Sequence, residues 1–297
     1  MSKAEKRICK WTSQGAAFFE FATSTAPTQS ADHIKPLHWY VACRLVLEGG
    51  FKPDEVTPRP PFRIEKGRSG SHLVFDAGVA GSGEQTVLGG LKTKNVDVVV
   101  TKPGLGPVVA VSCKGVTGAF RNLTNRLEET IGECTNLHIT YPALVLGYLV
   151  LLRANRLKSA IAEPSTVEEV SKILSANDIA LDDTGSPILS IVRFHNALVE
   201  MTGRQGIRDD ISRYESIGFG LVKTRGECCG ELVEDFPTPE SKLNLRTFFK
   251  TLYERYDERF VLSAPDLRSR TARLEWAQIS GLPESADYPL RLAFADN

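Results

Sequence analysis

Asp97 and Lys114 are the residues whose types and spacing could do chemistry together. Asp97 lies in a run of valines, and Lys114 ends a second apolar run that begins at Val108. A carboxylate or an ammonium group in such surroundings costs free energy unless it has a partner of opposite charge or a cation. A carboxylate-bound metal beside a lysine is an arrangement that can hydrolyse phosphodiester bonds. A plain salt bridge at the end of a hairpin explains the same pair, and this alternative stays open.

Two short strands position this pair. Val96–Val100 and Val108–Val111 are β-branched runs of strand length, and the turn at 102–107, Lys-Pro-Gly-Leu-Gly-Pro, separates them. The pattern therefore predicts a hairpin that carries an acid on its first strand and a lysine on its second.

Side chains alternate between the two faces of a strand. Ser112 and Lys114 are therefore expected on one face of the second strand, where Asp97 can join them, and Cys113 on the other face. The sequence thus predicts a polar cluster of three residues on one side of the hairpin.

The next segment predicts a loop that runs into a helix. Leu123, Leu127 and Ile131 recur at helical spacing, and we expect them to pack inward. Arg121, Asn125 and Glu128 would lie on an adjoining side, within reach of the same space. The apolar run Ala143–Leu152 follows as a long buried strand. Strand, helix and apolar strand in this order favour a right-handed crossover between parallel strands.

This series of residues resembles the PD-(D/E)xK nuclease superfamily, which includes type II restriction endonucleases, repair nucleases and defence nucleases. Asp97 corresponds to the first acid, and Ser112-Cys113-Lys114 to the second motif, with Ser112 where the common motif has an acid. Val96 stands where the family often has proline. Restriction enzymes that cut around a CCGG core share the Ser-x-Lys form and carry the second acid on the following helix. Glu128, fourteen residues after Lys114, stands at that position.

The resemblance implies a catalytic set of Asp97, Ser112, Lys114 and Glu128. Asp97, Glu128 and the carbonyl of Cys113 would hold Mg²⁺, a hard ion that prefers oxygen ligands. Lys114 would orient or deprotonate the attacking water and stabilise charge on the phosphate. Since Ser112 cannot replace the charge of a carboxylate, one metal is favoured over two.

The resemblance also implies the partners. A homodimer would act on double-stranded DNA, in restriction-modification or another form of antiviral defence. The candidate DNA contacts are Arg121, Asn122, Asn125 and Arg126. A catalytically weak nuclease-fold module for DNA binding or assembly is the alternative, because Ser112 replaces an acid. An unrelated α/β binding protein with a structural Asp97–Lys114 pair is a third possibility.

Charge is distributed in a way that fits a phosphate-bearing partner. The whole chain has 36 basic and 36 acidic residues, which does not suit a protein that coats nucleic acid indiscriminately. Between residues 59 and 126, ten basic residues face only four acidic ones. This local excess can supply phosphate contacts. A solvated surface neutralised by charges from elsewhere is the other interpretation.

The remaining composition indicates an ordinary intracellular protein. No apolar run reaches membrane-spanning length, and the first residues lack a signal-peptide apolar region. The six cysteines show no C-x-x-C spacing, and the five histidines show no metal-ligand spacing. We therefore expect a cytoplasmic location and no zinc site.

The expected architecture is an α/β fold, with a restriction-endonuclease-like mixed central sheet flanked by helices and an additional, mainly helical C-terminal part. Residues 1–160 would form the nuclease core with N-terminal helices. Residues 161–297 would form a recognition or dimerisation region, although a single domain is also possible. A helix is expected over His33–Glu48, where Glu48 is either solvated or a helix acid aimed at the metal. Another is expected from Ser165 to about Ser175, where a Ser-x-x-Glu capping pattern opens it.

Overall fold

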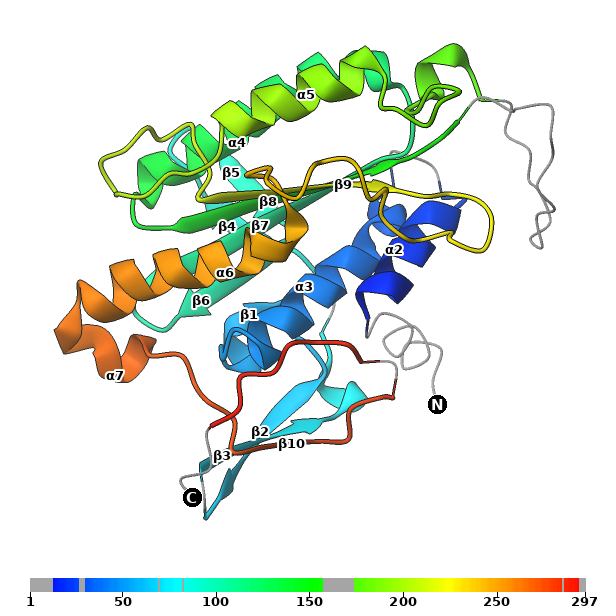
Figure 1. The fold of residues 1–297 in the computed structure, drawn as a ribbon. Coiled ribbons are helices and arrows are strands. Elements are labelled where there is room, and N and C mark those ends of the chain that lie inside the picture. Colours follow the sequence, from blue (N-terminus) through cyan, green and yellow to red (C-terminus); the bar gives the residue numbers. More distant parts are fainter. Residues whose placement is uncertain are drawn as a thin grey trace.

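The computed structural model describes residues 13–26, 30–68, 70–81, 83–156, 174–284 and 286–293. The helix expected from Ser165 lies almost entirely outside these residues. In the described residues the chain is a mixed α/β structure, in which helices cover both faces of a mixed central sheet (Figure 1).

In the part of the chain that the structure describes, the central sheet has five strands in the order β1-β6-β7-β8-β9. The first three are antiparallel, whereas β8 and β9 run parallel to β7. The strands are β1 (Val56–Thr57), β6 (Val98–Lys102), β7 (Gly106–Val116), β8 (Val145–Arg153) and β9 (Ser216–Val222). The predicted hairpin and the predicted buried strand are therefore present.

Among the described residues, two small sheets accompany the central one. The first has the order β10-β3-β2, from β2 (Phe62–Gly67), β3 (Gly70–Phe75) and β10 (Gln278–Ser280). The second is the hairpin of β4 (Gln85–Leu88) and β5 (Thr93–Val96), which leads directly into β6. β4 thus lies within the Gly-rich segment at residues 80–90.

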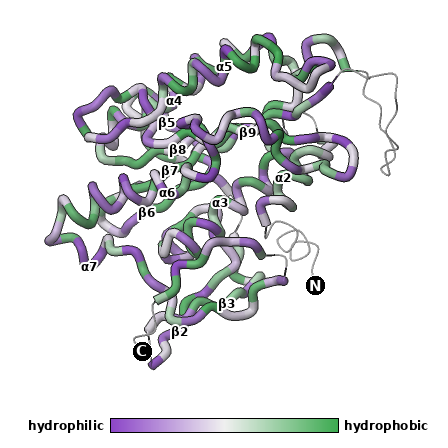
Figure 2. Tube along the Cα trace, viewed as in Figure 1, coloured by the Kyte–Doolittle hydropathy of each residue, from purple (hydrophilic) through white to green (hydrophobic). Residues whose placement is uncertain are grey.

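Helices form one layer on each face of the central sheet (Figure 1). α4 (Leu123–Thr140) and α5 (Leu189–Glu200) pack on one face, where side chains such as Val99, Tyr148 and Phe219 form an apolar cluster. The opposite face is covered by α2 (Gln14–Thr23), α3 (Lys35–Leu47) and α6 (Leu245–Tyr256). The short α7 (Arg268–Thr271) follows α6. Figure 2 shows the hydrophobic colouring concentrated along the central strands between these layers.

α4 connects β7 to β8, which lie side by side and parallel. Parallel neighbours cannot be joined by a tight turn, so the chain must cross one face of the sheet, and α4 does so. Leu123, Cys134 and Leu137 are the buried apolar residues of this helix. The crossover expected from the sequence order is thus present, and it lays α4 over β7.

The chain after residue 160 contributes to both larger sheets. β9 is the fifth strand of the central sheet, and β10 pairs in parallel with β3 near the start of the chain. The expected boundary at 160/161 therefore does not separate the sheets into two bodies. The seven residues of β9 are buried; β9 pairs with β8 of the first half and packs against α6 of the second. In the described residues no helix has the length and apolar character needed to cross a membrane.

Candidate functional site

Asp97 lies at the break between β5 and β6 and not inside a continuous strand. Its side chain is buried, with 7% of the residue exposed. One carboxylate oxygen, Oδ2, accepts three hydrogen bonds: from the Cys113 amide at 2.7 Å, Lys114 Nζ at 3.1 Å and the Ser112 hydroxyl at 3.3 Å. These donors compensate the cost of burying the carboxylate. None of these three donors contacts the other carboxylate oxygen, Oδ1.

The strand alternation predicted for β7 is confirmed. Ser112 and Lys114 meet Asp97, while the Cys113 side chain packs in the core beneath α3 and α6. The Cys113 amide, and not its carbonyl, is the group that contacts Asp97. The metal role expected for that carbonyl stays a prediction.

Lys114 pairs with Asp97 at 3.1 Å and is also influenced by the charge of Glu133. Burial alone lowers the pKa of Lys114, but the charges of Asp97 and Glu133 outweigh burial and raise that pKa above its ordinary value. The ammonium form is therefore the stable one. About a third of the Lys114 side chain is exposed, so its charge remains accessible from outside.

Glu133 of α4 is the acid that sequence reasoning missed. Its side chain is buried, and one oxygen pairs with Lys94 of β5 at 2.9 Å. The other oxygen, Oε1, is also buried and accepts no hydrogen bond from the described residues. A buried carboxylate oxygen without a donor costs free energy.

The rotation of α4 explains why Glu133 faces the sheet and Glu128 does not. In a helix of 3.6 residues per turn, four residues turn the chain by about 400°, so each four-residue step moves a side chain about 40° around the helix axis. The inward face passes through Leu123, Leu127, Thr130 and Cys134, and Ile131 is 42% exposed. The expectation that Ile131 packs inward is therefore wrong. Ile131 and Glu133 lie roughly 70–90° to opposite sides of this face, so helical spacing alone does not tell which of the two is buried.

Glu128 lies on the exposed side of α4. It is five residues from Glu133, about 140° around the helix axis. The electrostatic effect on Lys114 comes from Asp97 and Glu133. Glu128 as a metal ligand thus stays a prediction, whereas Glu133 is the α4 carboxylate that acts on the lysine.

Two further side chains approach Asp97, from segments distant in the sequence. His38 comes from α3, and Glu84 from the segment just before β4. His38 Nε2 is 3.8 Å from Asp97 Oδ1. One ligand atom from each of the three residues lies within 4.8 Å of the other two. The histidine spacing in the sequence gives no sign of this, because the three groups meet only when the helix and both segments are folded together.

His38 is buried, with 5% of the residue exposed, and its Nε2 has no hydrogen-bond partner among the described residues. Burial lowers the pKa of His38 to about 4, despite the opposing charge of Asp97. The ring is therefore neutral near pH 7, which is the form in which an imidazole nitrogen can bind a metal.

The neighbouring His33 has a different role. Its two ring nitrogens contact the carbonyl oxygens of Ser30 and Gly115 at 2.9 and 3.1 Å. Gly115 directly follows Lys114, so this contact fixes the end of β7 that carries the lysine. A Cβ on Gly115 would come within 2.8 Å of the Phe21 and His33 rings, which shows how closely this strand is packed.

Glu48 is distant from these contacts. It follows the last turn of α3 and pairs with Arg44 at 2.6 Å, while the Tyr253 hydroxyl donates to it at 3.2 Å. The role of a helix acid aimed at a metal is thus not supported for Glu48. His38 is the α3 residue that points toward Asp97.

The four candidate DNA contacts are exposed around the start of α4: Arg121, Asn122, Asn125 and Arg126. Arg126 pairs with Glu129 at 2.9 Å, an exposed ion pair of little energetic consequence. Asn122 precedes the helix without forming a side-chain cap. All four can thus reach a partner at the helix end that follows the strand of Lys114.

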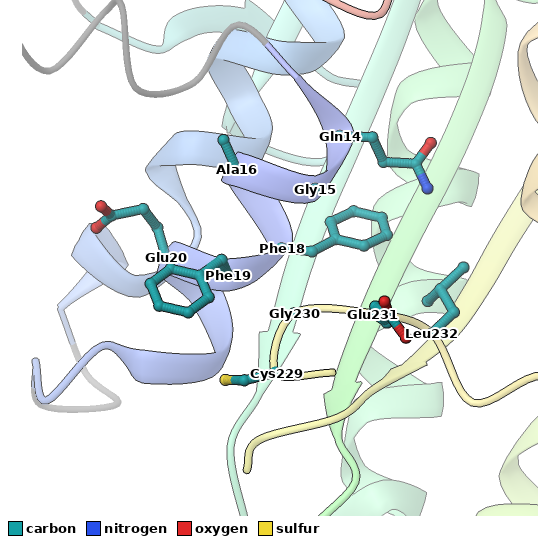
Figure 3. Close-up of a pocket in the computed structure, with 10 residues that line it drawn as sticks. All are labelled: Gln14, Gly15, Ala16, Phe18, Phe19, Glu20, Cys229, Gly230, Glu231 and Leu232. Atoms are coloured by element: carbon teal, nitrogen blue, oxygen red, sulfur yellow. The ribbon is translucent and has the colours of Figure 1, made fainter. Parts of the chain in front are cut away.

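A separate cavity of about 660 Å³ lies between α2 and residues 229–232 (Figure 3). Phe18, Phe19 and Leu232 line it together with the acids Glu20 and Glu231. Two carboxylates disfavour a phosphate there. None of the ten residues that line it belongs to the Asp97 cluster.

His138 is a structural histidine. Its ring nitrogens contact the carbonyl oxygens of Ile211 and Leu144 at 3.0 and 3.3 Å. It also lies 3.6 Å from the buried Glu215, which pairs with Arg204 and Arg259. This network joins α4 to the segment before β9 and does not include the Asp97 cluster.

No family model matches the chain, and neither the curated proteins nor the solved structures searched contain a significant match.

Proposed function

We propose that the protein is a metal-dependent endonuclease that hydrolyses phosphodiester bonds in DNA. The observation that carries this proposal is the contact between Lys114 on β7 and Asp97 directly before the neighbouring β6, with Ser112 in the same cluster. The chain order of hairpin, crossover helix and parallel strand also accords with the resemblance to the PD-(D/E)xK superfamily.

The residues present fit a divalent cation. The three donors to Asp97 all engage Oδ2, whereas Oδ1 faces the unpartnered Nε2 of His38. A cation beside Oδ1 would therefore leave the Lys114 contact intact. When bound, Mg²⁺ supplies a water of lowered pKa and neutralises charge on the phosphate.

Lys114 and Ser112 would act beside the Oδ2 oxygen of Asp97, whereas the cation would lie beside Oδ1. The Lys114 side chain is about one third exposed and positively charged. Its ammonium group can therefore bind a phosphate oxygen on which negative charge develops. Ser112 is fully buried and donates to Asp97, so it orients the carboxylate. Since Asp97 and Glu133 both stabilise the ammonium form, charge stabilisation is favoured over proton abstraction as the role of Lys114.

A duplex substrate is the natural partner for the exposed residues at the start of α4. Arg121 and Arg126 can contact phosphates, whereas Asn122 and Asn125 have the amide groups that read base edges. A homodimer would place one such site on each strand, as in restriction or phage-defence enzymes. These assignments rest on the resemblance together with the exposure of the four side chains.

Cleavage of mixed plasmid and phage DNA with Mg²⁺ tests the proposal. EDTA removes the metal ion, and Lys114→Ala removes the ammonium group of the site. Lys250→Ala is the matched variant, because Lys250 is an exposed lysine on α6. We expect cleavage by the wild type and by Lys250→Ala, and none with EDTA or Lys114→Ala. DNA binding without cleavage would favour the catalytically weak binding module. Neither cleavage nor binding would leave Asp97 and Lys114 as a structural ion pair.

A further inference from the structure

We infer that His38, Glu84 and Asp97 form a binding site for a divalent first-row transition-metal ion, with the His38 imidazole as a direct ligand. This inference deepens the proposed function, because it assigns the ligands and the class of ion at the same carboxylate. Glu84 and His38 replace Glu128 and the Cys113 carbonyl as the companions of Asp97.

The geometry brings three different donors together. The ligand atoms of His38, Glu84 and Asp97 lie within 4.8 Å of one another. Ligands bound at about 2.1 Å lie about 3.0 Å apart when adjacent and about 4.2 Å apart when opposite, so a 4.8 Å separation must close by roughly 0.6 to 1.8 Å. Glu84 is exposed and not part of a helix or strand, so its side chain can make this movement.

His38 supplies the independent evidence for a ligand. Its Nε2 is buried and unpartnered among the described residues, although it points at the Asp97 carboxylate 3.8 Å away. That separation is too long for a hydrogen bond. Burying a polar nitrogen in this way costs free energy that a metal bond would offset. His33, in contrast, has both ring nitrogens in contact with carbonyl oxygens.

The donor set indicates the class of ion. Carboxylate oxygens suit Mg²⁺, Ca²⁺ and Mn²⁺, whereas imidazole nitrogen suits ions of the first transition row. One nitrogen with two carboxylates combines both requirements, and Mn²⁺ satisfies them together. Because Glu84 is exposed, water or phosphate oxygens can approach the ion from that side of the site and complete its coordination. We therefore expect Mn²⁺ to bind this site more tightly than Mg²⁺.

Mn²⁺ binding to the full-length, metal-stripped protein tests the inference without measuring activity. Electron paramagnetic resonance of free Mn²⁺ gives the affinity, and pulsed measurements detect a nitrogen bonded to the ion. We expect nitrogen coupling in the wild type and its loss in His38→Gln. Glu84→Gln should weaken binding at least about tenfold, since losing even an outer partner of a metal ligand typically costs 10–100-fold.

Glu240→Gln is the matched control for Glu84→Gln, because both residues are exposed glutamates outside helices and strands. It should bind Mn²⁺ like the wild type. Because Glu84 is exposed, Glu84→Gln also remains informative if the buried His38→Gln variant does not fold. Glu128→Gln is the competing variant. If it weakens binding while Glu84→Gln does not, the inferred ligand set is wrong.

Two further outcomes separate this inference from the proposed function. Mn²⁺ binding through nitrogen without DNA cleavage would uphold the metal site and count against the nuclease. Lys114-dependent cleavage with no nitrogen coupling, and with unchanged Mn²⁺ affinity in Glu84→Gln, would uphold the nuclease and overturn the site. Absence of any Mn²⁺ binding would likewise overturn it.

Discussion

Replacing Lys114 by methionine should lower the rate of DNA cleavage by about 10²–10³-fold while leaving the protein folded. Methionine keeps an unbranched side chain of similar length but removes the charge. In the structure, Asp97 would retain the Cys113 amide and the Ser112 hydroxyl as donors and lose only the ammonium. The change therefore separates the chemical role of the lysine from the burial of the carboxylate.

The two effects differ in size. Losing one partner of a buried polar group costs about 1–3 kcal/mol, and the lower part of that range applies because the Lys114 side chain is 31% exposed. A domain with an unfolding free energy of about 5–15 kcal/mol remains folded after such a loss. Removing a group that stabilises transition-state charge typically lowers kcat by about 10²–10³-fold. Activity should therefore fall far more than stability.

The assay is the initial rate of plasmid cleavage at saturating protein, with urea unfolding measured on the same samples. Lys114→Arg is the informative companion, because it preserves the charge and cannot act as a base near neutral pH. We expect Lys114→Arg to retain more activity than Lys114→Met. Wild-type cleavage by Lys114→Met would refute the role of the lysine. Equal loss in both variants would refute the charge-stabilisation argument and favour proton transfer.

Three other changes test separate parts of the structure. Glu133→Gln should lower the cleavage rate without abolishing DNA binding, because it removes one of the two acids that favour the Lys114 ammonium. Cleavage rates and fluorescence anisotropy on the same DNA measure the two effects. An unchanged cleavage rate would count against a role for Glu133. Gly115→Ala should destabilise the protein by about 1–3 kcal/mol in urea unfolding, because its Cβ would overlap the Phe21 and His33 rings; a stability equal to wild type would contradict the packing at this strand. Glu215→Gln should cost about 3–5 kcal/mol at pH 7, since it leaves Arg204 and Arg259 buried without their counter-charge. Burial alone raises the pKa of Glu215, but the hydrogen bond and charge of His138 and the charge of Arg259 lower it below the ordinary value of 4.5. The stabilisation is thus fully present above pH 4.5 and is lost as the pH falls through the lower folded-state pKa, so the difference between Glu215→Gln and wild type should shrink in acid; a difference that stays constant down to pH 3 would refute this assignment.

The hairpin of the candidate site was predictable because its information is local. The valine runs, the Pro- and Gly-containing turn and the alternation along β7 together place Ser112 and Lys114 beside Asp97. The crossover through α4 was predictable for a related reason, since an apolar strand, a helix and another apolar strand favour a parallel pair. In these segments, the two-residue alternation of a strand and the order of elements along the chain determine which residues meet.

The helix face was harder to predict. Steps of four residues from Leu123 identify Leu127 correctly but then drift, so they place Ile131 inside and overlook Glu133. An error of one position rotates a helix face by about 100°, which is enough to exchange an exposed acid for a buried one. The second acid therefore depended on how α4 packs and not on the spacing from Lys114.

The sequence by itself determined the Asp97–Lys114 pair and the order of the strands around it, because strand period and turn chemistry act over short stretches of chain. Only the tertiary structure decided that His38 and Glu84 approach the same carboxylate, that β9 completes the sheet, and that β10 pairs with β3. Those contacts join segments far apart in the chain. Their formation depends on which faces of helices and sheets bury apolar surface together, and no local spacing in the sequence records that choice.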